Sequence, residues 1–139
     1  MYDILECISG TVGHNTMCYK LHKQKATWDD AKEACEQGET ELASASDEAT
    51  NNFLSTTFGR TEAGHAWLGG YREVVTNASS WKWTDKKWGP KNWGFTNWAP
   101  GEPKNDSYLV TNYLKSGQWD DQEKDTENNF ICQMSKKGF

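Results

Sequence analysis

The sequence predicts an α+β fold in which two helices are followed by short antiparallel strands and a long structured loop. Two segments in the first half of the chain carry apolar residues at helical spacing, and short strand-like segments occupy the last third. The stretch between them is rich in glycine, proline, asparagine and tryptophan and has no helical period. We take residues 1–139 as a single domain, because this length is too short for two independently stable cores.

The first helix is expected from Thr27 to Gln37, where apolar side chains recur at helical spacing. Thr27 stands at the N-cap position with Asp30 three residues later, which is a weak form of the capping box. Gly38 is expected to end the helix.

The second helix is expected to start at Ser46-Asp47-Glu48 and to run to about Phe58. Beyond it the period changes to that of strands. The expected strands are Ala66 to Tyr71, Tyr108 to Leu114, Gln118-Trp119 and Asn129 to Met134, with a hairpin turn at Ser116-Gly117.

Charge and aromatic content narrow the classes of partner. The net charge is −5, and the 15 basic residues do not cluster, so neither nucleic acid nor membrane insertion is expected. Eight tryptophans must supply much of the buried area, and we expect Trp67, Trp83 and Trp119 in the core. The three histidines have no catalytic motif around them, so an enzyme is not expected.

The chain has four cysteines without CxxC spacing, namely Cys7, Cys18, Cys35 and Cys132. With only three histidines to assist them, a zinc site is a poor interpretation, and disulfides are expected instead. Four cysteines allow three connectivities. Asn-X-Ser triplets at Asn77 and Asn105 fit the same oxidising, secretory compartment. We therefore expect a secreted protein whose signal peptide has been removed, since residues 1–10 do not have the pattern of one.

Short motifs follow one another in order along nearly the whole chain. They are Cys7, Cys18-Tyr19, Thr27-Trp28-Asp29-Asp30-Ala31, Cys35, Leu42-Ala43, Trp67-Leu68-Gly69-Gly70, Trp81-Lys82-Trp83-Thr84-Asp85, Asn97-Trp98, Gly101-Glu102-Pro103, Gly117-Gln118-Trp119-Asp120-Asp121 and Phe130-Ile131-Cys132. No single motif is specific. Together, at these separations, they resemble the C-type lectin family, and the early cysteine pair resembles its long form.

The resemblance implies a C-type-lectin-like fold, with two helices flanking short antiparallel sheets and a long loop that carries the ligand site. It also implies disulfides between Cys7 and Cys18 and between Cys35 and Cys132. In the chain-entropy model these close one short loop and one that spans most of the domain.

The resemblance further implies a calcium ion as the recognition device. Calcium takes six to eight oxygen ligands. A protein that supplies about five of these oxygens leaves coordination positions that two sugar hydroxyls can fill. Sugar-binding members use a Glu-Pro-Asn or Gln-Pro-Asp triplet with a cis proline and a Trp-Asn-Asp triplet on the next strand. The corresponding residues here are Glu102-Pro103-Lys104 and Trp119-Asp120-Asp121. The implied ligands are Glu102, Asp120 and Asp121, with Asn105 or Asp106 supplying a further oxygen.

Lys104 departs from this pattern because an ammonium group cannot coordinate a metal. At 4 Å from Ca²⁺, the electrostatic repulsion between the Lys104 ammonium and the ion would be about 8 kcal/mol with an effective dielectric constant of about 20. Its side chain must therefore point away, or no ion binds.

The expected function is calcium-dependent binding of carbohydrate through vicinal hydroxyls. The candidate sugar-contacting residues are Glu102, Lys104, Asp120, Trp93 and Trp98. Trp93 or Trp88 is expected to lie exposed near the site. The alternative is a calcium-independent module that binds a protein or a solid surface through its tryptophan-rich loop, and Lys104 favours it. A second copy of the chain, in a homodimer, is left open as a further partner.

Overall fold

The computed structural model describes residues 7–58, 65–75, 78–85, 95–103, 108–112 and 117–136. In chain order its elements are β1 (Val12–His14), β2 (Met17–Ala26), α1 (Trp28–Gln37), β3 (Glu41–Leu42), α2 (Glu48–Phe58), β4 (His65–Val75), β5 (Ala78–Trp83), β6 (Tyr108–Asn112), β7 (Gln118–Gln122) and β8 (Asn128–Ser135). None of the helices in these ranges is long and apolar enough to cross a membrane.

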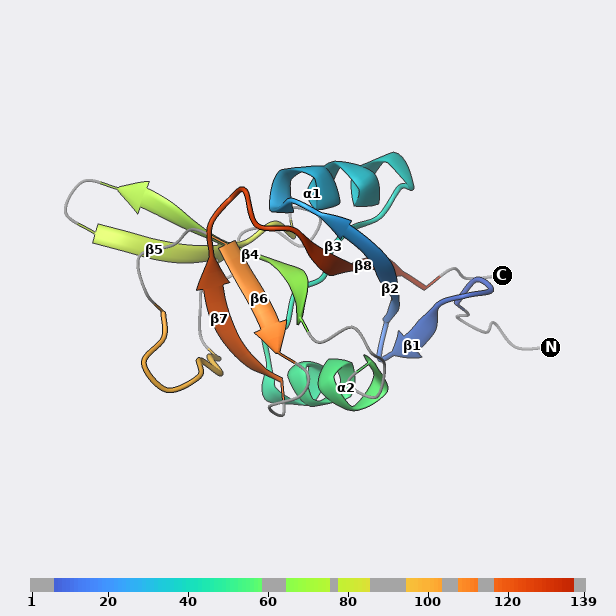
Figure 1. The fold of residues 1–139 in the computed structure, drawn as a ribbon. Coiled ribbons are helices and arrows are strands. Elements are labelled where there is room, and N and C mark those ends of the chain that lie inside the picture. Colours follow the sequence, from blue (N-terminus) through green and yellow to red (C-terminus); the bar gives the residue numbers. More distant parts are fainter. Residues whose placement is uncertain are drawn as a thin grey trace.

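One sheet organises the described part of the chain. Its main path runs β1-β2-β8-β4-β6-β7, while β3 pairs with β8 and β5 pairs with β4. The two helices lie on opposite sides of this sheet (Figure 1). The α+β prediction is confirmed, with one refinement: the sheet is mixed, because β4 and β8 pair in parallel.

Several strands lie where the sequence pattern predicts none. β1 and β3 are only three and two residues long, and the polar run from His22 to Lys25 interrupts β2, so these strands lack a clear apolar alternation. β5 falls inside the segment predicted to be loop, and β4 extends four residues beyond the predicted end at Tyr71 to Val75. Pairing between β4 and β5, from Gly70 opposite Trp83 to Val75 opposite Ala78, makes both strands possible. The partner, rather than local propensity, decides these strands.

The first helix begins as predicted. The hydroxyl of Thr27 accepts a hydrogen bond from the Asp30 amide at 3.2 Å, and Gly38 is the C-cap. The buried face of α1 consists of Trp28, Ala31 and Cys35. Asp47 caps the second helix, because its Oδ1 accepts a hydrogen bond from the Thr50 amide at 2.7 Å.

Replacing Thr27 with alanine is expected to lower the free energy of unfolding by about 1 kcal/mol, because one amide at the start of α1 loses its acceptor. Urea unfolding measures the change. Thr27→Ser keeps the hydroxyl and is the matched control, expected to stay within about 0.5 kcal/mol of the parent. Equal destabilisation by both substitutions would show that the lost methyl group, not the cap, matters.

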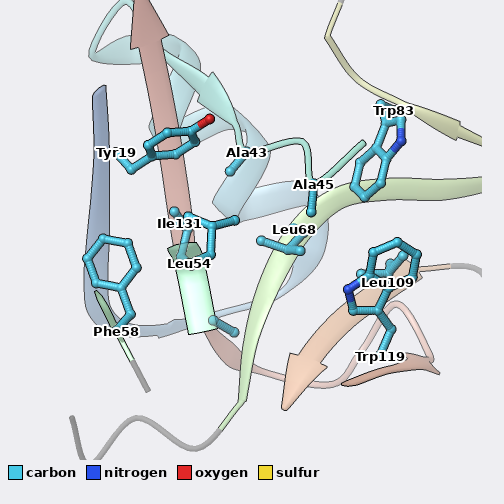
Figure 2. Packing of buried hydrophobic residues seen from close by; sticks show 11 residues of the cluster. Tyr19, Ala43, Ala45, Leu54, Phe58, Leu68, Trp83, Leu109, Trp119 and Ile131 are labelled. Carbon is cyan, nitrogen blue, oxygen red and sulfur yellow. The ribbon is translucent and has the colours of Figure 1, made fainter. Parts of the chain in front are cut away.

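The core lies on both faces of the sheet and is built around large rings. Trp67 and Trp119 are fully buried and Trp83 is nearly so, which confirms their predicted place. Figure 2 shows the cluster that joins α2, through Leu54 and Phe58, to the sheet. The indole N–H of Trp119 donates to Asn51 Oδ1 at 2.9 Å, and that of Trp67 donates to the Ala26 carbonyl at 2.8 Å. Each of these two buried donors is therefore satisfied.

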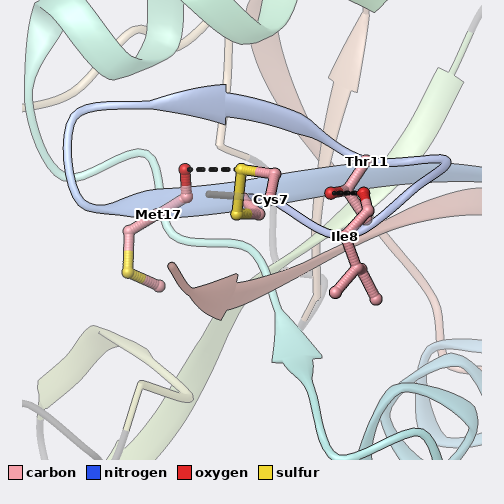
Figure 3. The surroundings of a disulfide bond; sticks show 5 residues. Cys7, Ile8, Thr11 and Met17 are labelled. Atoms are coloured by element: carbon pink, nitrogen blue, oxygen red, sulfur yellow. Dashed lines mark hydrogen bonds between the residues drawn. A yellow bond between two sulfur atoms is a disulfide. The ribbon is translucent and has the colours of Figure 1, made fainter. Parts of the chain in front are cut away.

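Both disulfides form with the pairing that the family resemblance implies. Cys35 on α1 joins Cys132 on β8, so the bond fastens the helix to the sheet. Cys7 joins Cys18 on β2, and the Cys7 sulfur lies 4.0 Å from the Met17 carbonyl oxygen (Figure 3). No free cysteine occurs in the described ranges.

Candidate functional site

The tight turn at Ala99 to Pro103 carries the first predicted ligand, Glu102. Its Glu102–Pro103 peptide bond is cis, as the family resemblance implies. The Glu102 amide donates to the Ala99 carbonyl at 2.9 Å, and Gly101 adopts a positive φ of 85°, which glycine accepts without steric cost. The Glu102 side chain is half-buried, whereas Pro103 is exposed. The turn therefore presents a carboxylate near the protein surface.

Hydrogen bonds hold this turn against β7. Trp98 forms a parallel bridge with Trp119, the Trp119 amide donates to the Asn97 carbonyl, and the Ala99 amide donates to the Trp119 carbonyl, each at 2.8 Å. The Asn97 side chain also donates to the Gly117 carbonyl at 3.0 Å. Two segments about twenty residues apart in sequence are thus held side by side, immediately before Asp120.

Strand alternation sends the two predicted aspartates of β7 to opposite faces. Trp119 and Asp121 are fully buried, while Gln118, Asp120 and Gln122 are half-buried. The register agrees, since Asp121 pairs with Leu109 of one core cluster and Asp120 pairs with Val110 of the other. The two carboxylates, although adjacent in the sequence, therefore lie on opposite faces of β7.

The buried Asp121 carboxylate has a cationic partner in Arg72 of β4, with 3.6 Å between Oδ2 and Nη2. The Arg72 guanidinium lies 4.9 Å from the centre of the Trp81 ring, and Trp81 packs on Trp98 at 4.9 Å between centroids. Arg72 is the residue that sequence reasoning misses. Its signal is a single arginine directly after the apolar strand that ends at Tyr71.

The described residues do not by themselves fit a calcium site. Among them, no three histidine, cysteine, aspartate or glutamate side chains gather closely enough to hold a metal ion. Asp121 faces a guanidinium, a group that repels a dication. Lys104, Asn105 and Asp106 lie outside the described residues, so the full ligand set stays a prediction.

The predicted sugar-contacting residues are placed in part. Trp98 is half-buried between Trp81 and Trp119, at 4.9 and 5.5 Å between ring centroids, so one portion of its indole reaches the surface. Glu102 and Asp120 are half-buried on the turn and on β7. Trp93, Trp88 and Lys104 lie outside the described residues, and their contacts with a ligand stay predictions.

The chain is similar to known proteins over most of its length. The Lectin C-type domain family model matches residues 24–134. The chain is 31% identical over 136 residues to the C-type lectin lectoxin-Phi2 of Philodryas olfersii, an alignment that covers 92% of this chain and 83% of the relative.

Two solved structures share the fold at lower identity. The C-type lectin CEL-I from Cucumaria echinata is 21% identical with a TM-score of 0.82, covering 95% of this chain and 99% of the other. A calcium-independent type II antifreeze protein is 24% identical with a TM-score of 0.81, covering 96% and 98%. The family model spans most of the chain, and the disulfides, the cis turn and the sheet accord with it. The protein therefore belongs to the C-type lectin family.

Proposed function

We propose that this domain binds carbohydrate at the surface formed by the Glu102–Pro103 turn and β7, and that Arg72 rather than calcium balances the charge of Asp121. The observation that carries the proposal is the Arg72–Asp121 ion pair, in which the carboxylate is fully buried. A buried carboxylate needs a partner, and here the chain itself supplies one.

The guanidinium of Arg72 disfavours the binding of calcium at Asp121. A Ca²⁺ ion placed 4 Å from it would meet a repulsion of about 8 kcal/mol at an effective dielectric constant of about 20. The ion would have to displace Arg72 from both Asp121 and the Trp81 ring. Calcium is therefore expected to add little to the stability of the folded domain.

The same surface offers the groups that a sugar needs. The Glu102 carboxylate can accept hydrogen bonds from hydroxyl groups, and Trp81 and Trp98 are both only half-buried, so part of each indole is accessible for contact with a pyranose ring. Pockets that recognise small ligands combine such aromatic walls with a few polar groups. Family membership supports a carbohydrate as the ligand.

Calcium-dependent sugar binding, the function expected from the sequence, is the second candidate. The observation in its favour is that the cis turn carrying Glu102 is hydrogen-bonded to the strand that carries Asp120 and Asp121. On that reading Asn105 or Asp106 would complete the ligand set, and the ion would compete with Arg72 for Asp121.

A glycan array probed in millimolar calcium and again in excess chelator separates the candidates. We expect the same glycans to be retained under both conditions, and the melting temperature of the free domain to agree within about 1 °C. A melting temperature several degrees higher in calcium, with glycan binding lost in chelator, would establish the calcium-dependent alternative instead. If no glycan is retained under either condition, carbohydrate is rejected as the ligand. The remaining candidate ligands are then a protein or a solid surface.

We also infer that the domain works in an oxidising compartment, in keeping with secretion. Both of its disulfides join described residues, and such bonds persist mainly outside the reducing cytosol. Recovery of the protein from the culture medium of an expressing cell, with both bonds intact by non-reducing peptide mapping, tests this inference.

A further inference from the structure

A polar cavity of about 210 Å³ is lined by none of the residues of the turn or of β7. Its walls come from four parts of the chain that are distant in sequence. The β1–β2 turn contributes His14 and neighbouring residues, the segment that leads into α2 contributes Ser44 and Asp47, Asp85 follows the end of β5, and Gln133 lies on β8. The fold therefore builds this cavity, because no local sequence motif contains it.

Two carboxylates line the cavity, and no lysine or arginine does so among the described residues. Asp85 is almost fully buried, whereas Asp47 is exposed at the start of α2. Both act on the hydroxyl of Tyr19: burial raises the pKa of Tyr19, and the charges of Asp47 and Asp85 raise it further. The two carboxylates thus project their negative field onto the same wall of the cavity.

A buried hydroxyl supplies an independent sign of a ligand. Ser44 is 5% exposed, lines the cavity, and its Oγ has no hydrogen-bond partner among the residues that the structure describes. The rest of Ser44 is well anchored, because its amide donates to Gln133 Oε1 at 2.9 Å. Leaving a buried polar atom without a partner destabilises the fold, and a ligand that hydrogen-bonds to the atom would recover that loss.

The chemistry of these walls selects one class of ligand. An anion would be repelled by Asp47 and Asp85. A bare metal ion would lack donors, since no three suitable side chains gather in the described residues, and a volume of 210 Å³ exceeds what one ion fills. An ammonium group on a short carbon chain fits both charge and size.

We propose that this cavity binds a primary ammonium group, carried by a small amine or by a lysine side chain. An ammonium has three N–H donors, which match the carboxylates of Asp47 and Asp85 and the hydroxyl of Ser44. Asp47 already accepts the Thr50 amide through Oδ1, but a carboxylate has about four acceptor positions and keeps capacity for a ligand. The Tyr19 ring provides an apolar wall for the adjoining carbons.

Isothermal titration calorimetry with n-butylamine, as its hydrochloride near pH 7, tests the proposal against n-butanol, a neutral molecule of similar shape. We expect saturable binding of the amine and none of the alcohol. Asp47→Asn is the main variant, because asparagine is an equally good N-cap and should leave α2 intact. It is expected to weaken amine binding about tenfold or more, as the loss of a charged hydrogen-bond partner does. Ser44→Ala is expected to weaken binding by a smaller factor.

Asp125→Asn is the matched control, since it removes one exposed carboxylate that does not line the cavity. It should leave amine binding unchanged. Amine binding that falls equally in Asp47→Asn and Asp125→Asn would reduce the effect to the net charge of the protein and overturn the proposal. Equal binding of butanol and butylamine, or no saturable binding of the amine to the parent protein, would also overturn it.

The two sources of the ammonium group are distinguished by a second titration with Nα-acetyl-lysine amide. Binding tighter than that of butylamine would identify a lysine side chain as the natural ligand, and weaker binding would identify a small free amine. These experiments do not involve the Glu102 turn, so their outcome is independent of the proposed carbohydrate site.

Discussion

Replacing Cys35 and Cys132 together with alanine is expected to lower the free energy of unfolding by about 4.7 kcal/mol. The two residues are 97 apart in sequence, and the bond restricts the unfolded chain the more, the longer the loop that it closes. In the folded protein the same bond fastens α1 to β8, and both cysteines are buried. Such a loss is comparable to the whole stability of many domains of this size, so partial unfolding at 37 °C is expected.

The Cys7→Ala, Cys18→Ala pair is the natural control. Its bond joins residues 11 apart, and the same chain-entropy relation gives a smaller loss of about 2.7 kcal/mol. Urea unfolding of the parent and both double variants measures the difference. If removal of either disulfide lowered the free energy of unfolding by the same amount, loop entropy would not be the main contribution of these bonds to stability.

Removing the guanidinium in Arg72→Ala is expected to destabilise the fold by about 3–5 kcal/mol. The substitution leaves the fully buried Asp121 carboxylate without its cationic partner, which is much worse than removing both charges. It also removes the cation from the Trp81 ring, a contact worth about 0.5–2 kcal/mol. The double variant Arg72→Ala, Asp121→Asn should recover part of the loss, because no unbalanced charge then remains.

Lys32→Ala supplies the contrasting control, since Lys32 pairs with Glu36 at the exposed surface of α1. Its loss should be below about 1 kcal/mol. Calcium adds a diagnostic that packing alone would not produce: it should raise the melting temperature of Arg72→Ala but not that of the parent. The proposal is contradicted if calcium does not stabilise Arg72→Ala and the variant loses no more free energy of unfolding than Lys32→Ala. Arg72 would then not balance the charge of Asp121 in place of calcium.

Much of the local structure is readable from the residues themselves. Thr27 and Gly38 bound the first helix because a hydroxyl side chain satisfies a free amide and glycine ends helices readily. The cysteine pairing and the cis turn at Glu102 were implied by the resemblance to the C-type lectin family, and the structure shows both. β5 could not be predicted in the same way, because its strand conformation depends on pairing with β4.

The family, the two helices, the buried tryptophans and the chemical types of the candidate site residues follow from the sequence alone, because caps, apolar periodicity and motif order are local properties of the chain. The contacts between charged side chains depend on the folded structure instead. Asp120 and Asp121 are adjacent in the sequence, yet the pleat of β7 turns one to each face. Sheet pairing then brings Arg72, almost fifty residues earlier, to Asp121, and the fold gathers Ser44, Asp47 and Asp85 around one cavity. Electrostatic interactions depend on distance and burial, which sequence separation does not reveal.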